Sequence, residues 1–186
     1  MRFALAPRVL DFDIENRPLS YAGQDFTFSE VTAIACKMIG ERGPVESWCL
    51  GEMDVADMLY AFLPWYNDAD IVTGHNIIKH DLPIINGACL ENGLPPLHPK
   101  LVCDTYFHLK RRQGVSASQE SLAAILRVKS PKVGMSQAAW REANRLTPEG
   151  IEKTRKRVTG DVRQHIAMRA ELLRREWLQP PKMWSP

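Results

Sequence analysis

The strongest constraint on the fold is an alternating segment near the start of the chain, "RVLDFDIENRP" (residues 8–18). Alternate side chains of a β-strand share a face, so this segment predicts a strand with one apolar and one acidic face. The apolar face holds Leu10, Phe12 and Ile14, and the acidic face holds Asp11, Asp13 and Glu15. Neighbouring carboxylates repel one another unless a cation neutralises them, so the acidic face indicates either a solvated surface or a divalent-metal site.

The rest of the chain changes from strand patterns to a strand–helix alternation. Strands are predicted in "FTFSEVTAIACKMIG" (26–40) and "PVESWCL" (44–50), joined by the turn "ERG". Residues 54–69 then show a helical period, with Asp54 as the N-cap. The later elements are a short buried strand at 70–76, a helix at 81–93, a strand running into a short helix at 101–107, and helices at 116–128 and 147–179. This order predicts an α/β fold with a mixed central sheet of about five strands and helices on both faces.

The length of 186 residues fits one domain, and no internal repeat or low-complexity linker divides the chain. We therefore expect a single domain over residues 1–186, with a proline-rich tail at about 179–186 and a flexible loop in "SPKVGMS" (130–136). No apolar run is long enough to cross a bilayer, and the first residues lack the features of a signal peptide. These observations predict a cytoplasmic protein.

Cysteine usage excludes two common structural devices. The four cysteines are Cys36, Cys49, Cys89 and Cys103. They are far apart in the sequence and form no CxxC pair, so zinc ligation and a disulfide framework are not expected. Free thiols are predicted.

Charge is divided unevenly along the chain, although the formal net charge is only +2. Residues 1–126 hold 10 Lys and Arg against 16 Asp and Glu, and residues 127–186 hold 14 against 6. An acidic half can hold metal ions while a basic half contacts a phosphate backbone. The other interpretation is that the basic side chains solvate helical faces.

Two later segments each add an acidic residue. In "VTGHNIIKHDLP", Asp81 follows a predicted strand at the start of a helix, where an Asp commonly serves as an N-cap. In "RVTGDVRQHIAMRAELL", helical spacing places Asp161 within an apolar stripe. Because a buried Asp is costly without a partner, Asp161 needs a cation, a hydrogen-bond network or a metal ion.

In their order and spacing, "LDFDIEN", "GHNIIKHDLP" and "GDVRQHIAMRAELL" resemble the three exonuclease motifs of the DnaQ-like (DEDD) 3′–5′ exonucleases. The second motif is closest to the form found in proofreading exonuclease domains of family-B DNA polymerases. The resemblance spans about residues 8 to 178 and implies a ribonuclease-H-like fold. The four carboxylates of the family motifs fall on Asp13, Glu15, Asp81 and Asp161. Asp11 precedes the motif and is not one of them.

The resemblance implies a two-metal-ion hydrolase that releases 5′-mononucleotides from the 3′ end of single-stranded DNA. Carboxylate oxygens suit Mg²⁺ or Mn²⁺, and two such ions at one site suit phosphodiester cleavage. By analogy with the family, Asp13 bridges both ions, and Glu15 and Asp161 help to hold the ion that carries the attacking water. Asp81 supports the second ion.

The chain departs from the family at the position of the expected general base. Active members usually carry a Tyr four residues, or a His five residues, before the last Asp, and here those positions are Arg157 and Lys156. Neither is an easy base at neutral pH, and Arg essentially never deprotonates. His165 lies one turn after Asp161 on the same face. It is therefore either a substitute catalytic base or a hydrogen-bonded core residue.

Several polar residues near the motifs are candidates for contacts with the substrate. His75 and Asn76 resemble family positions near the 3′-terminal nucleotide, and Asn16 follows the first motif, where its backbone can meet the terminal sugar. His80 is either a phosphate or base contact or part of an exposed polar pair at a helix start. The predicted substrate-binding residues are Asn16, His75, Asn76, His80, Lys156 and Arg157.

Two alternatives to the DNA exonuclease stay open. The first is an RNA 3′–5′ exonuclease, because no residue visibly reads the 2′-hydroxyl that separates RNA from DNA. The second is a nucleic-acid-binding accessory protein with impaired catalysis, which the missing Tyr or His favours. The complete set of four carboxylates favours the enzyme. The expected partners are DNA 3′ ends and a separate polymerase or replication protein, without a membrane.

Overall fold

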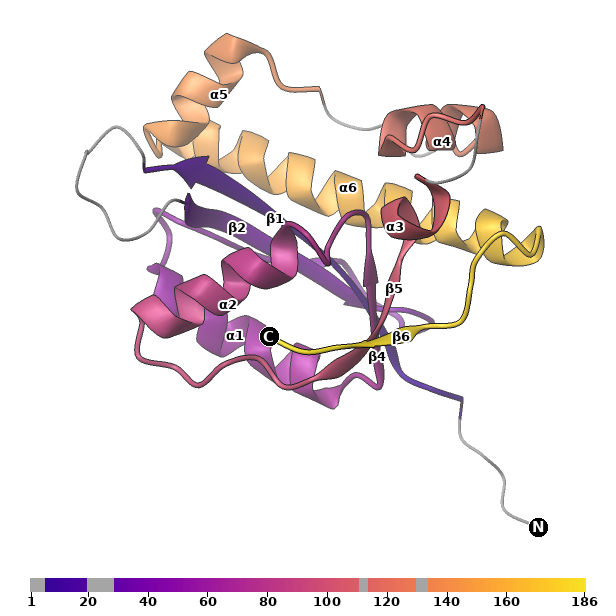
Figure 1. The fold of residues 1–186 in the computed structure, drawn as a ribbon. Helices are drawn as coiled ribbons and strands as arrows, with labels where there is room; N and C mark the ends of the chain where they lie inside the picture. The colour runs from indigo at the N-terminus through magenta and orange to yellow at the C-terminus, as the bar shows by residue number, and fades with distance from the viewer. Residues whose placement is uncertain (1–5, 20–28, 111–113, 130–133) are drawn as a thin grey trace.

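A six-stranded mixed sheet forms the centre of the computed structural model, which describes residues 6–19, 29–110, 114–129 and 134–186 (Figure 1). The strands are β1 (Val9–Pro18), β2 (Ser29–Met38), β3 (Glu46–Cys49), β4 (Ile71–Gly74), β5 (Lys100–Asp104) and β6 (Lys182–Trp184). The helices are α1 (Val55–Asp68), α2 (Asp81–Glu91), α3 (Thr105–Leu109), α4 (Gln119–Leu126), α5 (Gln137–Asn144) and α6 (Pro148–Arg174).

The order of the strands across the sheet is β3-β2-β1-β4-β5-β6. The first three strands pair antiparallel, as expected for segments joined by hairpins. β1, β4 and β5 pair parallel, and β6 returns antiparallel beside β5. β1 therefore lies in the middle, with neighbours on both edges, and the acidic motif that it carries is placed at the centre of the molecule.

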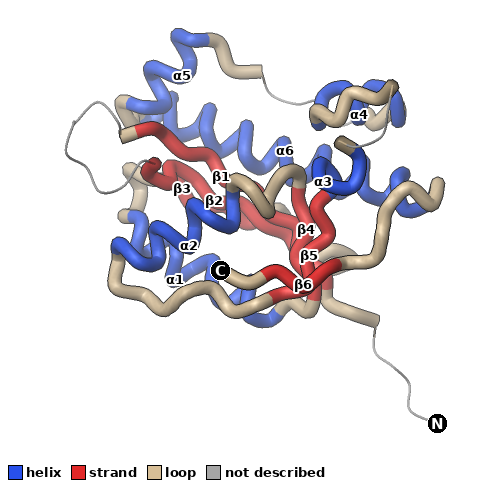
Figure 2. Tube along the Cα trace, viewed as in Figure 1, coloured by secondary structure: helices blue, strands red, loops and turns tan. Residues whose placement is uncertain are grey.

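Helices cover both faces of the sheet (Figure 2). α1 and α2 pack on one face, where Phe12 of β1 contacts Phe62 of α1 with ring centroids 5.4 Å apart. α6 packs on the other face, across β1, β2 and β3. The alternation in β1 explains this arrangement, since its apolar side chains enter the larger core under α1 and α2 and its carboxylates face α6.

Small side chains let α6 approach the sheet closely. Ala33 and Ala35 of β2 pair in register with Glu15 and Asp13 of β1, and both alanines are fully buried. They form an apolar cluster with Val158, Val162 and other residues of this face. Burying these side chains stabilises the contact by on the order of 1–2 kcal/mol for each valine. The same contact brings the polar side chains of α6 against the acidic face of β1.

The mixed sheet with helices on both faces confirms the predicted α/β class and is consistent with a ribonuclease-H-like fold. Two elements differ from the prediction. β6 forms within the expected proline-rich tail, and it adds a sixth strand at the sheet edge. α5 follows the predicted flexible loop at 130–136, of which residues 130–133 lie outside the described residues.

Two further predictions concern the chain as a whole. The four cysteines are buried free thiols, as predicted. Among the helices of the described ranges, none combines the length and the apolar composition needed to span a membrane. The organisation of residues 1–186 as one domain stays a prediction.

Candidate metal centre and nucleic-acid cleft

The acidic face of β1 matches one face of α6 residue by residue. Two residues of a strand advance about 6.6 Å and four residues of a helix advance 6 Å, so every second residue of β1 can meet every fourth residue of α6. The three facing pairs are Glu15 with Arg157, Asp13 with Asp161, and Asp11 with His165. We call this contact between β1 and α6 the seam. At each of its three positions a carboxylate of β1 meets a different partner on α6.

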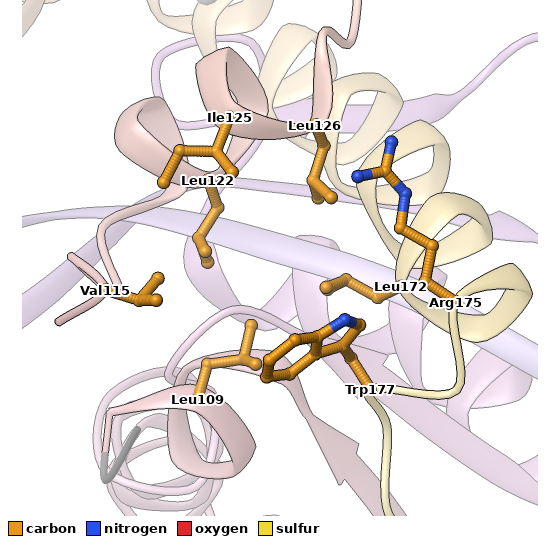
Figure 3. A pocket seen from close by; sticks show the side chains of 8 residues that line it. All are labelled: Leu109, Val115, Leu122, Ile125, Leu126, Leu172, Arg175 and Trp177. Carbon is orange, nitrogen blue, oxygen red and sulfur yellow. The ribbon is translucent and has the colours of Figure 1, made fainter. Parts of the chain in front are cut away.

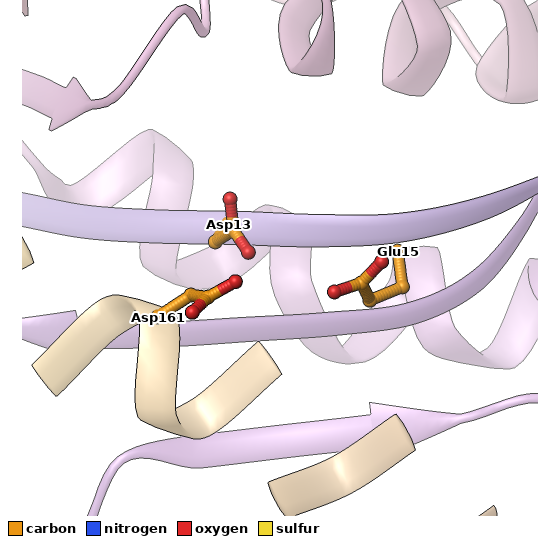
Figure 4. Close-up of side chains that lie close together, drawn as sticks. All are labelled: Asp13, Glu15 and Asp161. Atoms are coloured by element: carbon orange, nitrogen blue, oxygen red, sulfur yellow. The ribbon is translucent and has the colours of Figure 1, made fainter. Parts of the chain in front are cut away.

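The middle of the seam is a cluster of carboxylates. One oxygen from each of Asp13, Glu15 and Asp161 lies within 4.8 Å of the others. Figure 4 shows the first two projecting from the strand and the third from the helix, with their carboxylates converging. Hard divalent cations such as Mg²⁺ and Mn²⁺ prefer such oxygens. The donor set fits a divalent metal ion, and the three residues could hold one.

The proximity of these carboxylates changes their protonation. Burial holds the pKa of Asp13 well above its usual value, and the negative charges of Asp81, Glu15, Asp161 and Asp11 raise it further. A proton or a cation is therefore needed to neutralise the centre. A divalent ion would displace that proton, because it supplies more positive charge at the same place.

Arg157 supplies positive charge beside this cluster. Its Nε lies 2.5 Å from Oε1 of Glu15, and its Nη2 lies 3.7 Å from Oδ2 of Asp161. The guanidinium carbon also lies 5.3 Å from the ring centre of Trp140, on α5. Burial alone lowers the pKa of Arg157, but the carboxylates of Glu15 and Asp161 raise it by more. Arg157 is thus a positioned cation beside the carboxylates.

Asp81 enters the same cleft from the start of α2. It is 2% exposed, and its Oδ1 accepts a hydrogen bond of 3.1 Å from the backbone N–H of Ile14. Burial raises the pKa of Asp81 to about 7, while the N–H donor opposes that rise. Asp81 lies outside the three-carboxylate cluster but lines the same cleft. Its predicted role in metal binding stays a prediction.

The third pair of the seam starts a buried chain of hydrogen bonds that ends at the cleft. Nδ1 of His165 lies 2.6 Å from Oδ2 of Asp11, and its Nε2 lies 2.9 Å from Oγ1 of Thr105. The same hydroxyl lies 2.9 Å from Nδ1 of His75 and donates to the carbonyl of Gly74. The Thr105 hydroxyl thus joins the imidazole of His165 to that of His75. Asp11 thereby fixes the orientation of His75 through two intermediates.

The loop that carries His75 has a demanding backbone. Gly74 allows no side chain, since a Cβ there would lie 2.3 Å from Ile77 and 2.9 Å from the carbonyl of Phe12. Asn76 adopts a left-handed φ of 71°, which Asn tolerates better than most residues. The carboxylate of Asp104, at the end of β5, accepts hydrogen bonds from the N–H groups of Asn76 and Ile78. The two parallel strands thus hold the loop at the edge of the cleft.

Asn16 and His80 meet on the opposite side of the loop. The Asn16 side chain donates to Ser29 Oγ at 2.5 Å, and its Oδ1 lies 3.0 Å from Nε2 of His80. Asn16 follows a register irregularity in the β1–β2 pairing. Such irregularities redirect side chains near functional sites. Here Asn16 contacts both Ser29 of β2 and His80, the residue before α2.

These elements enclose an open cleft of about 410 Å³. Most of the predicted site residues line it, namely Asp13, Glu15, Asn16, His75, Asn76, His80, Asp81, Arg157 and Asp161. Two predicted residues lie elsewhere. His165 is buried behind the cleft in the hydrogen-bond chain, and Lys156 is exposed on α6, 3.4 Å from Glu152. The three sequence motifs therefore converge on one site, but those two side chains do not line it.

Other residues of the site escaped the sequence analysis. Tyr106, Ser118 and Gln119 line the cleft, and the Gln119 side chain donates a 3.0 Å hydrogen bond to the backbone carbonyl of Asp161. Asp11 and His165 could have been paired from the sequence, because the spacings i, i+2, i+4 on the strand and i, i+4, i+8 on the helix match. Thr105 and Trp140 carried no comparable signal.

A second pocket of about 140 Å³ lies between α3, α4 and the end of α6 (Figure 3). It is lined mainly by apolar side chains, namely Leu109, Val115, Leu122, Ile125, Leu126, Leu172 and Trp177, with Arg175 as the charged member. Such a lining offers few groups to a phosphate or a metal ion. The acidic cleft is therefore the candidate site for chemistry on a nucleic acid.

Comparisons with known proteins bear mainly on the fold. No protein-family model and no curated protein matches the sequence. Among solved structures, the chain is similar to the family B DNA polymerase from the hyperthermophilic archaeon Pyrobaculum calidifontis, with a TM-score of 0.71 and 19% sequence identity. The match covers 93% of this chain and 25% of the polymerase chain. At this identity the likeness shows a shared fold, and this chain spans about a quarter of that polymerase.

Proposed function

We propose that this chain is a metal-dependent 3′–5′ exonuclease that releases 5′-mononucleotides from the 3′ end of single-stranded DNA. The observation that carries the proposal is the convergence of Asp13, Glu15 and Asp161 within 4.8 Å in an open cleft, with Asp81 on the opposite wall. The likeness to a family B DNA polymerase supports it, because the sequence motifs resemble proofreading exonuclease motifs of the same polymerase family.

The cofactor of the proposed reaction is Mg²⁺ or Mn²⁺, with two ions per site. When bound, such ions activate water for attack on the phosphorus and stabilise the leaving 3′-oxygen. Glu15 and Asp161 would help to hold the ion that activates the attacking water, Asp13 would serve both ions, and Asp81 would support the second ion. The backbone N–H of Ile14 donates to Oδ1 of Asp81 and so holds this carboxylate at the cleft.

The remaining cleft residues would hold the 3′-terminal nucleotide. His75 is oriented by Thr105 and packs edge-on against Tyr106, with ring centroids 5.5 Å apart. Aromatic side chains at such a place can stack on an unpaired base. His80 and Asn16 form a polar pair at the rim that can meet a phosphate or a sugar. We expect the protein to act in the cytoplasm, beside a separate polymerase or replication partner.

The test is release of mononucleotides from a linear single-stranded DNA oligomer in Mg²⁺ or Mn²⁺. A 3′ label should appear at once in mononucleotides, and a 5′ label should appear in a ladder of shortened oligomers. A circular single strand of the same sequence should stay intact, because it offers no end. A matched RNA oligomer measures the preference for deoxyribose over ribose. Equal or faster release from RNA would mean that the substrate is the 3′ end of RNA.

The controls use substitutions that keep side-chain shape. Asp13→Asn and Asp161→Asn should each abolish release, while Asp57→Asn should leave it unchanged. Asp57 is an exposed carboxylate on α1, on the face of the sheet opposite the cleft. Absence of release from every substrate in both metals would refute the proposed activity.

One observation favours a second candidate, a nucleic-acid-binding accessory protein without catalysis. Arg157 stands where active relatives usually have a Tyr, and it contacts two of the three clustered carboxylates. A protein of this kind would bind single-stranded DNA but release no nucleotide, and its binding would persist in a chelator. The same oligomer, assayed for binding and for release, separates the two candidates.

A further inference from the structure

The contacts of Arg157 place a monovalent cation inside the proposed metal centre. Its guanidinium contacts Glu15 at 2.5 Å and Asp161 at 3.7 Å, and both carboxylates belong to the cluster that could hold a divalent ion. The three side chains are largely buried, with exposed fractions of 18% for Arg157, 11% for Glu15 and 6% for Asp161. Charges at this depth are screened little by salt, so their interaction is strong.

A residue of α5 also holds the guanidinium of Arg157. It lies over the ring of Trp140, 5.3 Å from its centre, and such a cation–π contact favours one orientation of the side chain. α5, which carries Trp140, is itself fixed to α6 by an ion pair between Lys153 and Glu142. Close packing of Gly150 against the α5 backbone adds to this, since a Cβ at Gly150 would lie 2.3 Å from the carbonyl oxygen of Glu142. Arg157 is therefore a positioned cation rather than a mobile surface side chain.

A divalent ion and this guanidinium compete for the same carboxylate of Glu15. The ion needs direct contact with carboxylate oxygens, and the guanidinium hydrogen bond occupies Oε1 of Glu15. Two cations within a few ångströms of each other also repel strongly where solvent is largely excluded. Metal binding must therefore displace or weaken the contacts of Arg157 with the cluster.

We propose that Arg157 is an internal counter-ion of the metal centre, which holds Glu15 and Asp161 together in the metal-free protein and competes with divalent ions for them. This inference rests on the proposed function, because it assumes that the carboxylate cluster binds a divalent ion. Its consequence is that the protein stays folded without metal and loads the ion only above a concentration that Arg157 sets.

The test is Mn²⁺ binding to the full chain by isothermal titration calorimetry, together with the thermal unfolding midpoint in chelator and in saturating Mn²⁺. Arg157→Met removes the charge but keeps a long side chain that can lie on Trp140. The matched control is Arg155→Met, on the same helix, where the arginine pairs with Glu52 away from the cleft. Arg157→Lys keeps a cation without the planar fork of Arg and serves if Arg157→Met does not fold in chelator.

We expect Arg157→Met to bind Mn²⁺ about tenfold more tightly than the wild type, and Arg155→Met to bind it within about twofold of the wild type. Arg157→Met should unfold at a lower temperature than the wild type in chelator, and saturating Mn²⁺ should remove that difference. Arg157→Lys should bind Mn²⁺ more tightly than the wild type, but less tightly than Arg157→Met.

Equal or weaker Mn²⁺ binding by Arg157→Met and Arg157→Lys, beside clear binding by the wild type, would overturn the inference and leave the metal centre standing. A loss of stability that Mn²⁺ does not reverse would likewise show a purely structural role. If neither the wild type nor any variant binds Mn²⁺, both the inference and the proposed metal centre fail.

Discussion

The two ends of the acidic stripe on β1 begin from the same residue types and reach opposite electrostatic solutions. At one end, Asp11 is 1% exposed and pairs with His165 through a 2.6 Å hydrogen bond. At the other end, Asp13 and Glu15 face a cleft together with Asp161, a third carboxylate. The first end is neutralised within the protein. The second end combines these three acids with the guanidinium of Arg157 and can accept further positive charge.

The difference is made by α6 rather than by the strand. The helix offers a histidine opposite Asp11, an aspartate opposite Asp13 and an arginine opposite Glu15. Only the facing partner decides whether a carboxylate on β1 is a structural hydrogen-bond acceptor or a candidate metal ligand. An acidic strand pattern is therefore ambiguous until the register of the facing helix is known. Substitutions at the two ends of the stripe should therefore have different effects on cleavage and on stability.

The largest expected effect concerns cleavage. Asp13→Asn and Asp161→Asn should each lower the rate of mononucleotide release by more than about a hundredfold, because even residues behind metal ligands typically contribute 10- to 100-fold. Asp11→Asn should lower it by less than about tenfold, since Asp11 acts only through His165 and His75. Release from a 3′-labelled oligomer measures all three. If Asp11→Asn lowers the rate of release as much as Asp13→Asn does, Asp11 is not merely a structural residue and the proposed distinction between the two ends is wrong.

The next largest effect is expected on stability. Here substitutions at the Asp11 end should matter more than substitutions at the Asp13 end. His165→Ala would leave Asp11 buried without its partner, which should destabilise the protein by about 3 kcal/mol. Burial raises the pKa of Asp11, while His165 and the charge of Arg169 oppose that rise. Because Arg169 would remain, the expected loss is near the low end for a broken buried pair. Asp13→Asn should change stability little, or raise it, in a chelator because it relieves repulsion. Urea unfolding compares the two variants, and a larger loss for Asp13→Asn would contradict the account.

The pH dependence of the metal-free protein should report on Asp81. Its pKa is raised to about 7 in the folded state from 3.8, so the folded state binds this proton more tightly than the unfolded state. The contribution to stability is complete below about pH 4 and is lost as the pH rises to about 7, by at most about 4 kcal/mol. Unfolding in chelator at several pH values measures it. Asp81→Asn should flatten the decline, and an unchanged slope would argue against the raised pKa.

The smallest effect is expected at Lys156, which is exposed on α6 outside the lining of the cleft. The Lys156 side chain is 65% exposed and pairs with Glu152 at 3.4 Å, so Lys156→Ala should change stability by less than about 0.5 kcal/mol. If Lys156 contacts the DNA backbone, its loss should reduce the slope of the logarithm of the binding constant against the logarithm of the salt concentration by about one. Fluorescence anisotropy at several salt concentrations measures this slope. A large loss of cleavage in Lys156→Ala would place this residue in the site after all.

Local patterns were sufficient to predict the parts of the site that depend on one segment. The alternation of β1 places Asp13 and Glu15 on one face, and the apolar stripe of α6 marks Asp161 as a residue that needs a partner. Neither inference required knowledge of the tertiary structure. The fold class followed from the order of the strand and helix patterns, because hairpin strands and a strand–helix alternation allow few arrangements.

What escaped prediction depends on contacts between distant segments. The structural role of His165 depends on Asp11, 154 residues earlier in the chain, and on Thr105 at the end of β5. α5 has eight residues, of which Ala143 is buried, so the segment is short and polar and does not stand out as a helix in the sequence. β6 has three residues in a proline-rich segment and forms because β5 offers an open edge. Such elements are defined by their neighbours rather than by their own composition.

The most direct test of the account is to locate Mn²⁺ by anomalous X-ray scattering in crystals of the full chain soaked in the ion. We expect a peak at about 2.1 Å from oxygens of Asp13, Glu15 and Asp161, with Arg157 moved away from Glu15 and no peak between Asp11 and His165. Absence of a peak at the three carboxylates under saturating Mn²⁺, or a peak at Asp11 instead, would contradict it.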